Sequence, residues 1–308
     1  MNLYFAPLEG ITTFTYRNTH NEMFGGVDYY YAPFITPSDN EKVNKKGVRD
    51  ILPENNTSKI IPQVLVNNSI SFLKFCKKIR ELGYFDININ LGCPSSTVVR
   101  KGRGSGFLKE PDKLDLFLSE IFDDTDMLVS VKTRTGYSES NEFDRLLEIY
   151  NTYPLSELII HPRTREDYYK GLPDDEVFKK AYNNTEIPLS YNGNIFSKED
   201  YDAKISKFPN LKGVMIGRGA VSNPAIFREI KGGKKLTTDE LLEFSERLRD
   251  NYLKVLGSDI YTLHKLKEIW MYIMWRYPEE KKILKSIKKS ESLKEFMSSI
   301  EQIKHISL

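Results

Sequence analysis

Cysteine and long apolar runs are both scarce in this sequence. Among its 308 residues there are two cysteines, Cys76 and Cys93, and we find neither a signal peptide nor an apolar stretch long enough to cross a membrane. These absences argue against a secreted, disulfide-rich protein and against a membrane protein. We therefore expect a reduced, cytoplasmic protein that does not bind membranes.

An excess of charge of one sign is also missing, and so is a metal-binding pattern. The 45 basic and 43 acidic residues give a formal net charge of +2, so a nucleic-acid partner would have to be recognised by local patches. The four histidines and two cysteines stand at no metal-ligand spacing. We therefore expect no metal site.

Eight short strand-like runs alternate with helical patterns before residue 220. The runs cover residues 3–6, 27–32, 60–66, 85–91, 127–133, 157–161, 188–191 and 213–216. Between two of them, Phe72, Phe75, Cys76 and Ile79 recur on one helical face. Eight alternating units in about 230 residues are typical of a (β/α)8 TIM barrel. A doubly wound sheet is the alternative, but its glycine fingerprint is missing after the first strand.

From Thr237 onward the sequence shows amphipathic helices and no strand pattern. We therefore predict an α/β fold in which residues 1–235 form the TIM barrel and residues 236–308 form a C-terminal all-helical domain. Between His264 and Lys289 there are eight basic residues against three acidic ones. A charge run of this kind is usually a solvated helix face, and the alternative is a surface that follows RNA phosphates.

Polar residues gather where the predicted strands end. In a barrel these ends face one common mouth, so their side chains are expected to lie close together. Any one of them is weak support for a site, because a lone cysteine, for example, is more often a small buried hydrophobe. Their coincidence on one rim predicts an active site. The residues are Glu9, Gln63, Asn90, Cys93, Lys132, Arg134, His161, Asn192, Asn194 and Arg218.

Cys93 follows the strand-like run 85–91, where Pro94 prevents both strand pairing and a helical Cys93. The glycine-containing segment that comes next is expected to be a flexible loop, and it carries Arg100, Lys101 and Arg103. A thiol at the end of a strand beside a basic loop indicates an active site.

A second site is predicted at Gly217-Arg218-Gly219, after the eighth strand, with a helix expected to begin near Asn223. Backbone N–H groups beside glycines and the positive end of that helix favour phosphate at this position of a barrel. Arg218 can add a bidentate contact. Lys132, on the fifth strand, can hold a negative charge or form a Schiff base, and the sequence does not choose between the two.

Six motifs occur in the order typical of the tRNA-dihydrouridine synthases, which the chain resembles from residue 6 to 228. They are APLEG at 6–10, NLGCPS at 90–95, VKTR at 131–134, IHPRT at 160–164, NGNI at 192–195 and MIGRGA at 215–220. The helical tail resembles that family's RNA-binding domain. The resemblance implies that FMN binds in the barrel mouth and that the C5–C6 double bond of uridines in tRNA is reduced, with NADPH or NADH as electron donor. No protein partner is implied, and we expect a monomer.

The resemblance also implies roles for the cofactor-binding residues. Pro7, Leu8 and Glu9 line the flavin, Gln63 and Lys132 meet its pyrimidine edge, and His161 lies against it. Its phosphate end is held by Asn192, Gly193, Asn194, Gly217 and Arg218. Tyr191 stands where the family commonly has a small residue, and it is expected to crowd the cofactor floor.

On the substrate side, the resemblance implies that Asn90 and Arg134 orient the uracil while Arg100, Lys101 and Arg103 contact RNA at the rim. Cys93 protonates C5 after hydride reaches C6. A thiol with an ordinary pKa of about 8.5 is mostly protonated at neutral pH, so it can act as an acid without tuning. The helical tail is expected to bind RNA and do no chemistry, so a chain ending near residue 235 should keep its flavin.

Two other interpretations remain open. A dihydroorotate-dehydrogenase-like enzyme would keep the barrel and the flavin but act on a free pyrimidine, and the basic helical tail argues against it. A non-catalytic RNA-binding protein on a decayed barrel is the other. The intact Asn90, Cys93, Lys132, His161 and Arg218 argue against that one.

Overall fold

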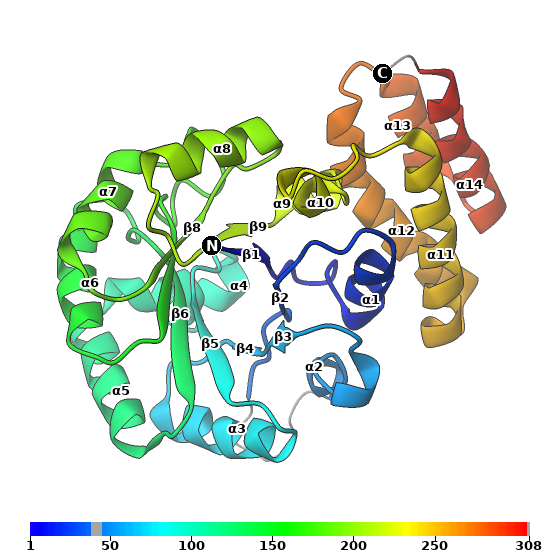
Figure 1. Cartoon of the computed structure of the whole chain (residues 1–308). Helices are drawn as coiled ribbons and strands as arrows, with labels where there is room; N and C mark the ends of the chain where they lie inside the picture. Colours follow the sequence, from blue (N-terminus) through cyan, green and yellow to red (C-terminus); the bar gives the residue numbers. More distant parts are fainter. Residues whose placement is uncertain (38–44, 307–308) are drawn as a thin grey trace.

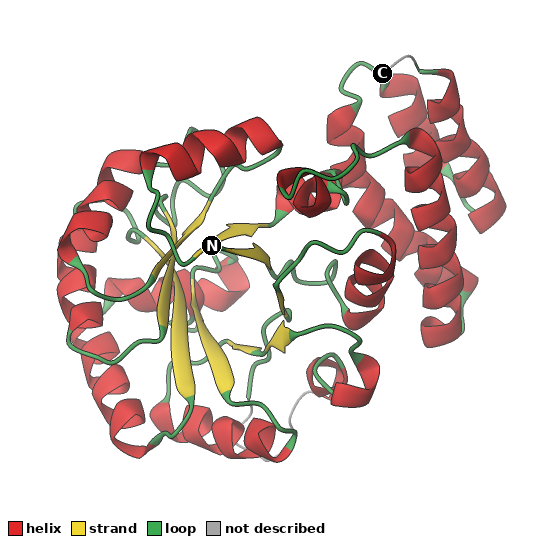
Figure 2. Ribbon diagram, viewed as in Figure 1, coloured by secondary structure: helices red, strands yellow, loops and turns green. Residues whose placement is uncertain are grey.

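The computed structural model describes residues 1–37 and 45–306, and its centre is a parallel sheet (Figures 1 and 2). The strands are β1 (Asn2–Phe5), β2 (Tyr29–Tyr31), β3 (Ile60–Ile61), β4 (Gln63–Val64), β5 (Asp86–Leu91), β6 (Leu128–Arg134), β7 (Glu157–His161), β8 (Leu189–Asn192) and β9 (Gly213–Ile216). Their order in the sheet is β3-β2-β1-β9-β8-β7-β6-β5-β4.

The two ends of this sheet belong to one stretch of chain, so the sheet closes on itself. Ile60 pairs with Tyr30 of β2, whereas Gln63 pairs with Asn88 of β5. Pro62 separates the two halves, because proline has no N–H to donate to a neighbouring strand. Its carbonyl still accepts from the Asn88 N–H at 3.0 Å. The predicted strand 60–66 is therefore split and shorter than expected, and the (β/α)8 TIM barrel is confirmed.

Helices cover the outside of the barrel (Figure 1). The longer ones are α1 (Phe14–Met23), α3 (Ser69–Glu81), α5 (Pro111–Asp124), α6 (Glu142–Asn151), α7 (Asp175–Asn184) and α8 (Lys198–Lys207). The barrel part of the chain also contains shorter helices, which are α2 (Lys45–Arg49), η1 (Pro53–Asn55), α4 (Ser96–Val99), η2 (Gly104–Lys109), α9 (Arg218–Ser222) and α10 (Ile226–Ile230). The helical face predicted from Phe72, Phe75, Cys76 and Ile79 is the buried face of α3.

The last part of the described chain is entirely helical. It contains α11 (Thr238–Leu256), α12 (Asp259–Ile273), η3 (Met274–Arg276), α13 (Lys281–Lys289), α14 (Leu293–Glu301) and η4 (Gln302–His305). α11 begins with a capping box between Thr237 and Glu240, and Trp270 is buried among these helices. α11 packs against α1 of the barrel and against α12. Whether residues 236–308 form a separate domain stays a prediction.

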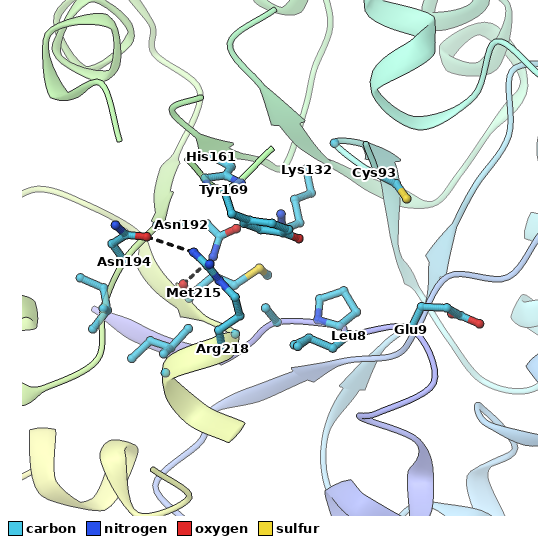
Figure 3. A pocket seen from close by; sticks show the side chains of 18 of the residues that line it. Leu8, Glu9, Cys93, Lys132, His161, Tyr169, Asn192, Asn194, Met215 and Arg218 are labelled. Carbon is cyan, nitrogen blue, oxygen red and sulfur yellow. Dashed lines mark hydrogen bonds between the residues drawn. The ribbon is translucent and has the colours of Figure 1, made fainter. Parts of the chain in front are cut away.

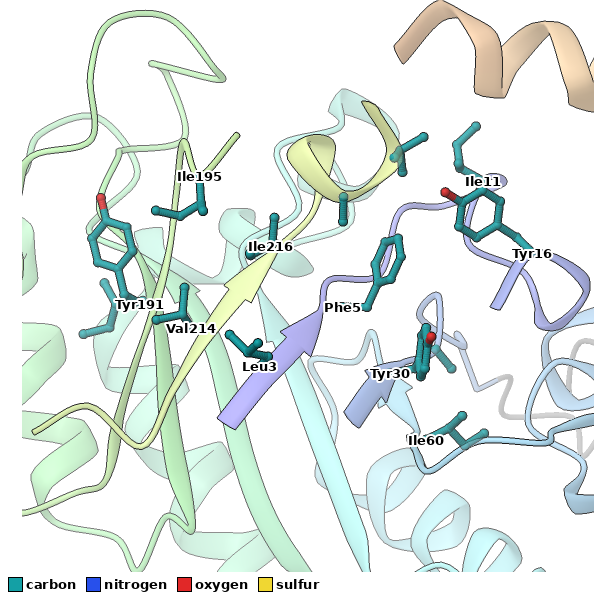
Figure 4. Packing of buried hydrophobic residues seen from close by; sticks show 14 of the residues in the cluster. Leu3, Phe5, Ile11, Tyr16, Tyr30, Ile60, Tyr191, Ile195, Val214 and Ile216 are labelled. Carbon is teal, nitrogen blue, oxygen red and sulfur yellow. The ribbon is translucent and has the colours of Figure 1, made fainter. Parts of the chain in front are cut away.

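The hydrophobic core lies mainly between the sheet and its helices, because alternate side chains of each strand point outward. Leu3 and Phe5 of β1 lie beside Val214 and Ile216 of β9 in this layer (Figure 4). Tyr4, between Leu3 and Phe5, belongs instead to a smaller separate cluster. No helix in the described part of the chain is both long and apolar enough to cross a membrane.

His20 connects α1 to the barrel inside this core. Its Nε2 lies 2.7 Å from the Pro224 carbonyl and its Nδ1 lies 2.7 Å from the Tyr30 hydroxyl. Because a carbonyl only accepts, Nε2 carries the proton and the hydroxyl donates to Nδ1. Burial of the ring lowers the pKa of His20 to about 3.

Candidate active site in the barrel mouth

A pocket of about 690 Å³ opens at the carboxyl ends of the strands. Figure 3 shows its side chains, which converge from several strands and from the loops that follow them. Most of the predicted site residues line it. These are Pro7, Leu8, Glu9, Asn90, Cys93, Lys132, Arg134, His161, Asn192, Gly193, Asn194, Gly217 and Arg218.

Four of the predicted residues do not line the pocket. Gln63 is fully buried beside it, where its Oε1 accepts from Asn90 Nδ2 at 2.7 Å and its Nε2 donates to Asn88 at 2.7 Å. Arg100 and Lys101 are exposed, and Arg103 is half-buried.

Asn90 holds the backbone that presents Cys93. Its Oδ1 accepts from the N–H groups of Gly92 at 3.1 Å and Cys93 at 2.9 Å. The Cys93 carbonyl in turn accepts from the Ser105 N–H at 3.1 Å and from its hydroxyl at 2.8 Å. The thiol is therefore carried by a turn that is hydrogen-bonded on both sides.

The expected flexible loop after Cys93 is wrong. The chain forms α4 and then η2, whose residues 104–108 are buried. Gly104 has a φ of +56°, and a Cβ there would stand 2.9 Å from the Cys93 carbonyl oxygen. The glycines of this segment therefore allow close packing against the Cys93 turn and do not supply flexibility.

Lys132 lies beside Asn90 in the sheet register and points into the pocket (Figure 3). Its ammonium has no hydrogen-bond or ion-pair partner among the residues that the structure describes. Burial, and then the positive charge of Arg134, lower its pKa to about 7. Cys93 is affected in the opposite direction, because burial raises the pKa of its thiol. At neutral pH the pocket therefore holds a protonated thiol and an easily deprotonated lysine.

Arg134 joins the Cys93 turn to the loop after β7. Its Nε donates to the Gly92 carbonyl at 2.9 Å, its Nη1 to Thr164 at 2.7 Å and its Nη2 to Tyr168 at 2.8 Å. The side chain is 1% exposed, and burial lowers its pKa to about 10, so it stays charged at neutral pH. Arg134 thus fixes the relative position of two loops that line the pocket.

Arg218 forms the other end of the pocket. Its Nη2 donates to Asn194 Oδ1 at 3.0 Å, and its guanidinium carbon lies 4.2 Å from the centre of the Tyr169 ring. The helix expected near Asn223 is α10, which begins at Ile226, and a further short helix, α9, precedes it with Arg218 as its first residue. Gly219 makes this possible, since a Cβ there would stand 1.9 Å from the Ile195 carbonyl oxygen.

The expected crowding of the pocket floor by Tyr191 is wrong. Its ring packs against Phe178 of α7 at 5.0 Å, and its hydroxyl donates to Asp175 at 3.3 Å. Tyr191 is a core residue that faces the helices, because its neighbours Ser190 and Asn192 take the opposite side of β8.

Several pocket residues were not predicted from the sequence. Tyr169 and Phe196 lie in loops, where no periodicity singles out a residue. Met271, Tyr272 and Trp275 come from the helical region, so the pocket is completed by a part of the chain that was expected to bind RNA only.

Solved structures share the fold of this chain at very low sequence identity. A morphinone reductase matches with a TM-score of 0.55 and 9% identity, over 77% of this chain and 88% of that chain. A histamine dehydrogenase from Rhizobium sp. 4-9 matches with a TM-score of 0.56 and 9% identity, over 75% and 45%. These likenesses concern the barrel fold alone.

Relatives in sequence give the family. Residues 4–306 match the family described as Dihydrouridine synthase (Dus), and the chain belongs to this family. tRNA-dihydrouridine synthase B of Shewanella oneidensis is 31% identical over 206 residues, which are 65% of this chain and 63% of that protein. The enzyme of the same name from Escherichia coli K12 is 28% identical over 247 residues, 77% of this chain and 73% of that protein. The family predicted from the motifs is confirmed.

Proposed function

We propose that this protein is a tRNA-dihydrouridine synthase, an FMN-dependent oxidoreductase that reduces the C5–C6 double bond of uridines in tRNA with electrons from NADPH or NADH. The observation that supports this most directly is that Cys93 and Lys132, whose ammonium has no hydrogen-bond or ion-pair partner among the described residues, line one pocket in a chain of the dihydrouridine synthase family.

The residues of the pocket fit FMN. Its volume of about 690 Å³ lies within the usual range for a ligand of that size. At one end of the pocket, Lys132 has no hydrogen-bond or ion-pair partner among the described residues, and at the other end Arg218 and Asn194 offer a charge and an amide group. A Cβ at Gly217 would stand 3.2 Å from the Ala6 Cβ, so a glycine keeps this wall open. When bound, FMN supplies hydride-transfer chemistry.

Each protein group then has a role that its surroundings allow. Lys132 stabilises negative charge on the pyrimidine edge of the flavin, because no described anion pairs with its ammonium and such a charge favours the protonated form of a lysine whose pKa burial lowers to about 7. Arg218 and Asn194 bind the phosphate end. Cys93 gives a proton to C5 of the uracil. Asn90 and Arg134, predicted to orient the uracil, also hold the Cys93 turn in place.

The surface for tRNA is proposed on α13 and on the pocket rim. Lys281, Lys282, Lys285, Lys288 and Lys289 are exposed, whereas the apolar face of the same helix is buried. None of these lysines has an ion-pair partner among the described residues. Such lysines suit phosphate binding, which supports the proposal that residues 236–308 are the tRNA-binding domain, with Arg100 and Lys101 as further RNA contacts. We propose that the protein acts as a cytoplasmic monomer.

The test is reduction of unmodified tRNA by the purified protein. We expect a yellow protein that releases FMN on denaturation and forms dihydrouridine in tRNA when NADPH or NADH is supplied. Free uracil and dihydroorotate serve as controls for the dihydroorotate-dehydrogenase-like alternative. A flavin-loaded protein that converts either control and leaves tRNA unchanged would contradict the proposal.

A further inference from the structure

His161 ends β7 in the wall of the pocket, and Arg163 holds its ring. Arg163 Nη1 lies 3.0 Å from His161 Nε2, and the two residues are 2% and 6% exposed. A guanidinium has N–H donors and no acceptor. The arginine must therefore donate, and His161 Nε2 must offer its lone pair.

Arg163 is fixed in this position by three other contacts. Its Nε donates to the Lys170 carbonyl at 3.1 Å, and its Nη2 donates to Gly171 at 2.6 Å and to Asn194 Oδ1 at 3.2 Å. The guanidinium plane is therefore set by the loop after β7 and by Asn194. It cannot turn to give His161 a different partner without breaking these bonds.

We propose that Arg163 is a positioning residue that fixes His161 as a neutral imidazole with its proton on Nδ1, so that this N–H is the donor offered to the pocket ligand. No residue that the structure describes accepts a hydrogen bond from Nδ1. The ligand is the flavin, so this part of the inference rests on the proposed function, whereas the tautomer follows from Arg163 alone.

The cations around the His161 ring also favour its neutral form. Lys132 and Arg134 face it from β6, Arg163 from its own loop and Arg218 from α9. Tyr169 is the aromatic neighbour of the ring, with 6.1 Å between the two ring centres. The carboxylate of Asp167, on the same loop, accepts from the N–H and hydroxyl of Thr164.

Burial together with these cations holds the pKa of His161 well below its ordinary value. The imidazole is therefore neutral at ordinary pH, so its ring does not carry the extra proton that an acid would give to C5. This agrees with the Cys93 thiol as the proposed acid. His161 instead contributes one hydrogen-bond donor with a fixed direction and no charge.

The test is nitrogen NMR of the histidine rings in the FMN-loaded protein, with the His161 signals assigned by their loss in His161→Gln. We expect a protonated Nδ1, an unprotonated Nε2 and no titration between about pH 5.5 and 9. A proton on Nε2, or a titration in this range, would overturn the proposal without any further variant. The same spectrum of flavin-free protein separates the two hypotheses, because failure to bind FMN would contradict the proposed function and leave the tautomer assignment standing.

Variants then test whether Arg163 is what keeps the proton of His161 on Nδ1. In Arg163→Met the donor to Nε2 is lost, so the proton should no longer be confined to Nδ1 and the ring nitrogen signals should show a mixture of tautomers, while burial and the remaining cations still hold the pKa of His161 low. Arg163→Lys, which keeps a donor without an acceptor, should retain the native tautomer. Arg165→Met is the matched control, because Arg165 lies on the same loop and contacts Tyr168. An unchanged His161 in Arg163→Met would refute the positioning role.

Discussion

Replacement of Cys93 by alanine distinguishes two roles for this residue, the proposed general acid and a side chain that only fills space. The Ser95 backbone hydrogen-bonds to its sulfur atom, and the bonds that hold its turn run from the Cys93 backbone to Asn90 and Ser105. Alanine keeps the bonds that hold the turn. Cys93→Ala should therefore cost about 1 kcal/mol of unfolding free energy at most and leave FMN and tRNA binding unchanged.

The effect on rate should be far larger. Loss of a positioned acid slows a reaction by roughly 10²–10⁴-fold, which corresponds to about 3–5 kcal/mol in the barrier. Reduction of the enzyme by a nicotinamide cofactor should be unaffected, since no proton is delivered to C5 in that step. Because burial raises the pKa of the thiol, the part of the native rate that depends on Cys93 as an acid should fall only on the alkaline side.

The assay is single-turnover oxidation of the reduced flavin by unmodified tRNA, at equal flavin occupancy of Cys93→Ala and native protein. Cys93→Ser is the matched control, and it should rescue poorly because a hydroxyl is far less acidic than a thiol. Equal rates for the native and alanine proteins would remove Cys93 from the mechanism.

Four other changes test the cofactor site, the RNA surface and the core. Arg218→Ala should weaken FMN binding by about 2 kcal/mol, measured by flavin fluorescence, and full flavin retention would refute the phosphate assignment. A chain ending at residue 235 should lose FMN, contrary to the expectation from sequence, because the helical region lines the pocket; retained flavin would restore that expectation. Charge reversal at Lys285 and Lys288 should weaken tRNA binding and reduce its dependence on salt concentration. An unchanged affinity would mean that these lysines only form a solvated helix face. His20 has a folded pKa of about 3, below its unfolded value of about 6.5, so the unfolding free energy should fall by up to about 1.4 kcal/mol per pH unit below pH 6.5, and His20→Gln should remove this part of the slope in acid denaturation.

The fold was predictable because both of its periodicities are visible in the sequence. The apolar spacing of α3 and the alternation of apolar and polar residues in β5 are local properties of the sequence. The carboxyl ends of the strands in a barrel share one face, and this holds for any conformation of the loops between them. The positions of the strand ends therefore predict that Cys93, Lys132, His161 and Arg218 surround one pocket, and the structure confirms it. The motif resemblance gave the family.

The errors concern residues whose position depends on distant parts of the chain. Glycines after Cys93 were interpreted as flexible, whereas Gly104 is needed for contact with the Cys93 carbonyl. Tyr191 was placed on the wrong side of its strand, because a four-residue strand shows little alternation. Trp275 reaches the pocket only through the packing of α12 on the barrel, which no local pattern records.

The most direct test of the proposed function is a map of dihydrouridine along each tRNA from cells with and without the gene for this protein. We expect loss of dihydrouridine from one or more specific positions, restored by the native gene and not by one encoding Cys93→Ala. Identical dihydrouridine maps in the two cell lines, at native levels of flavin-loaded protein, would contradict the proposed function.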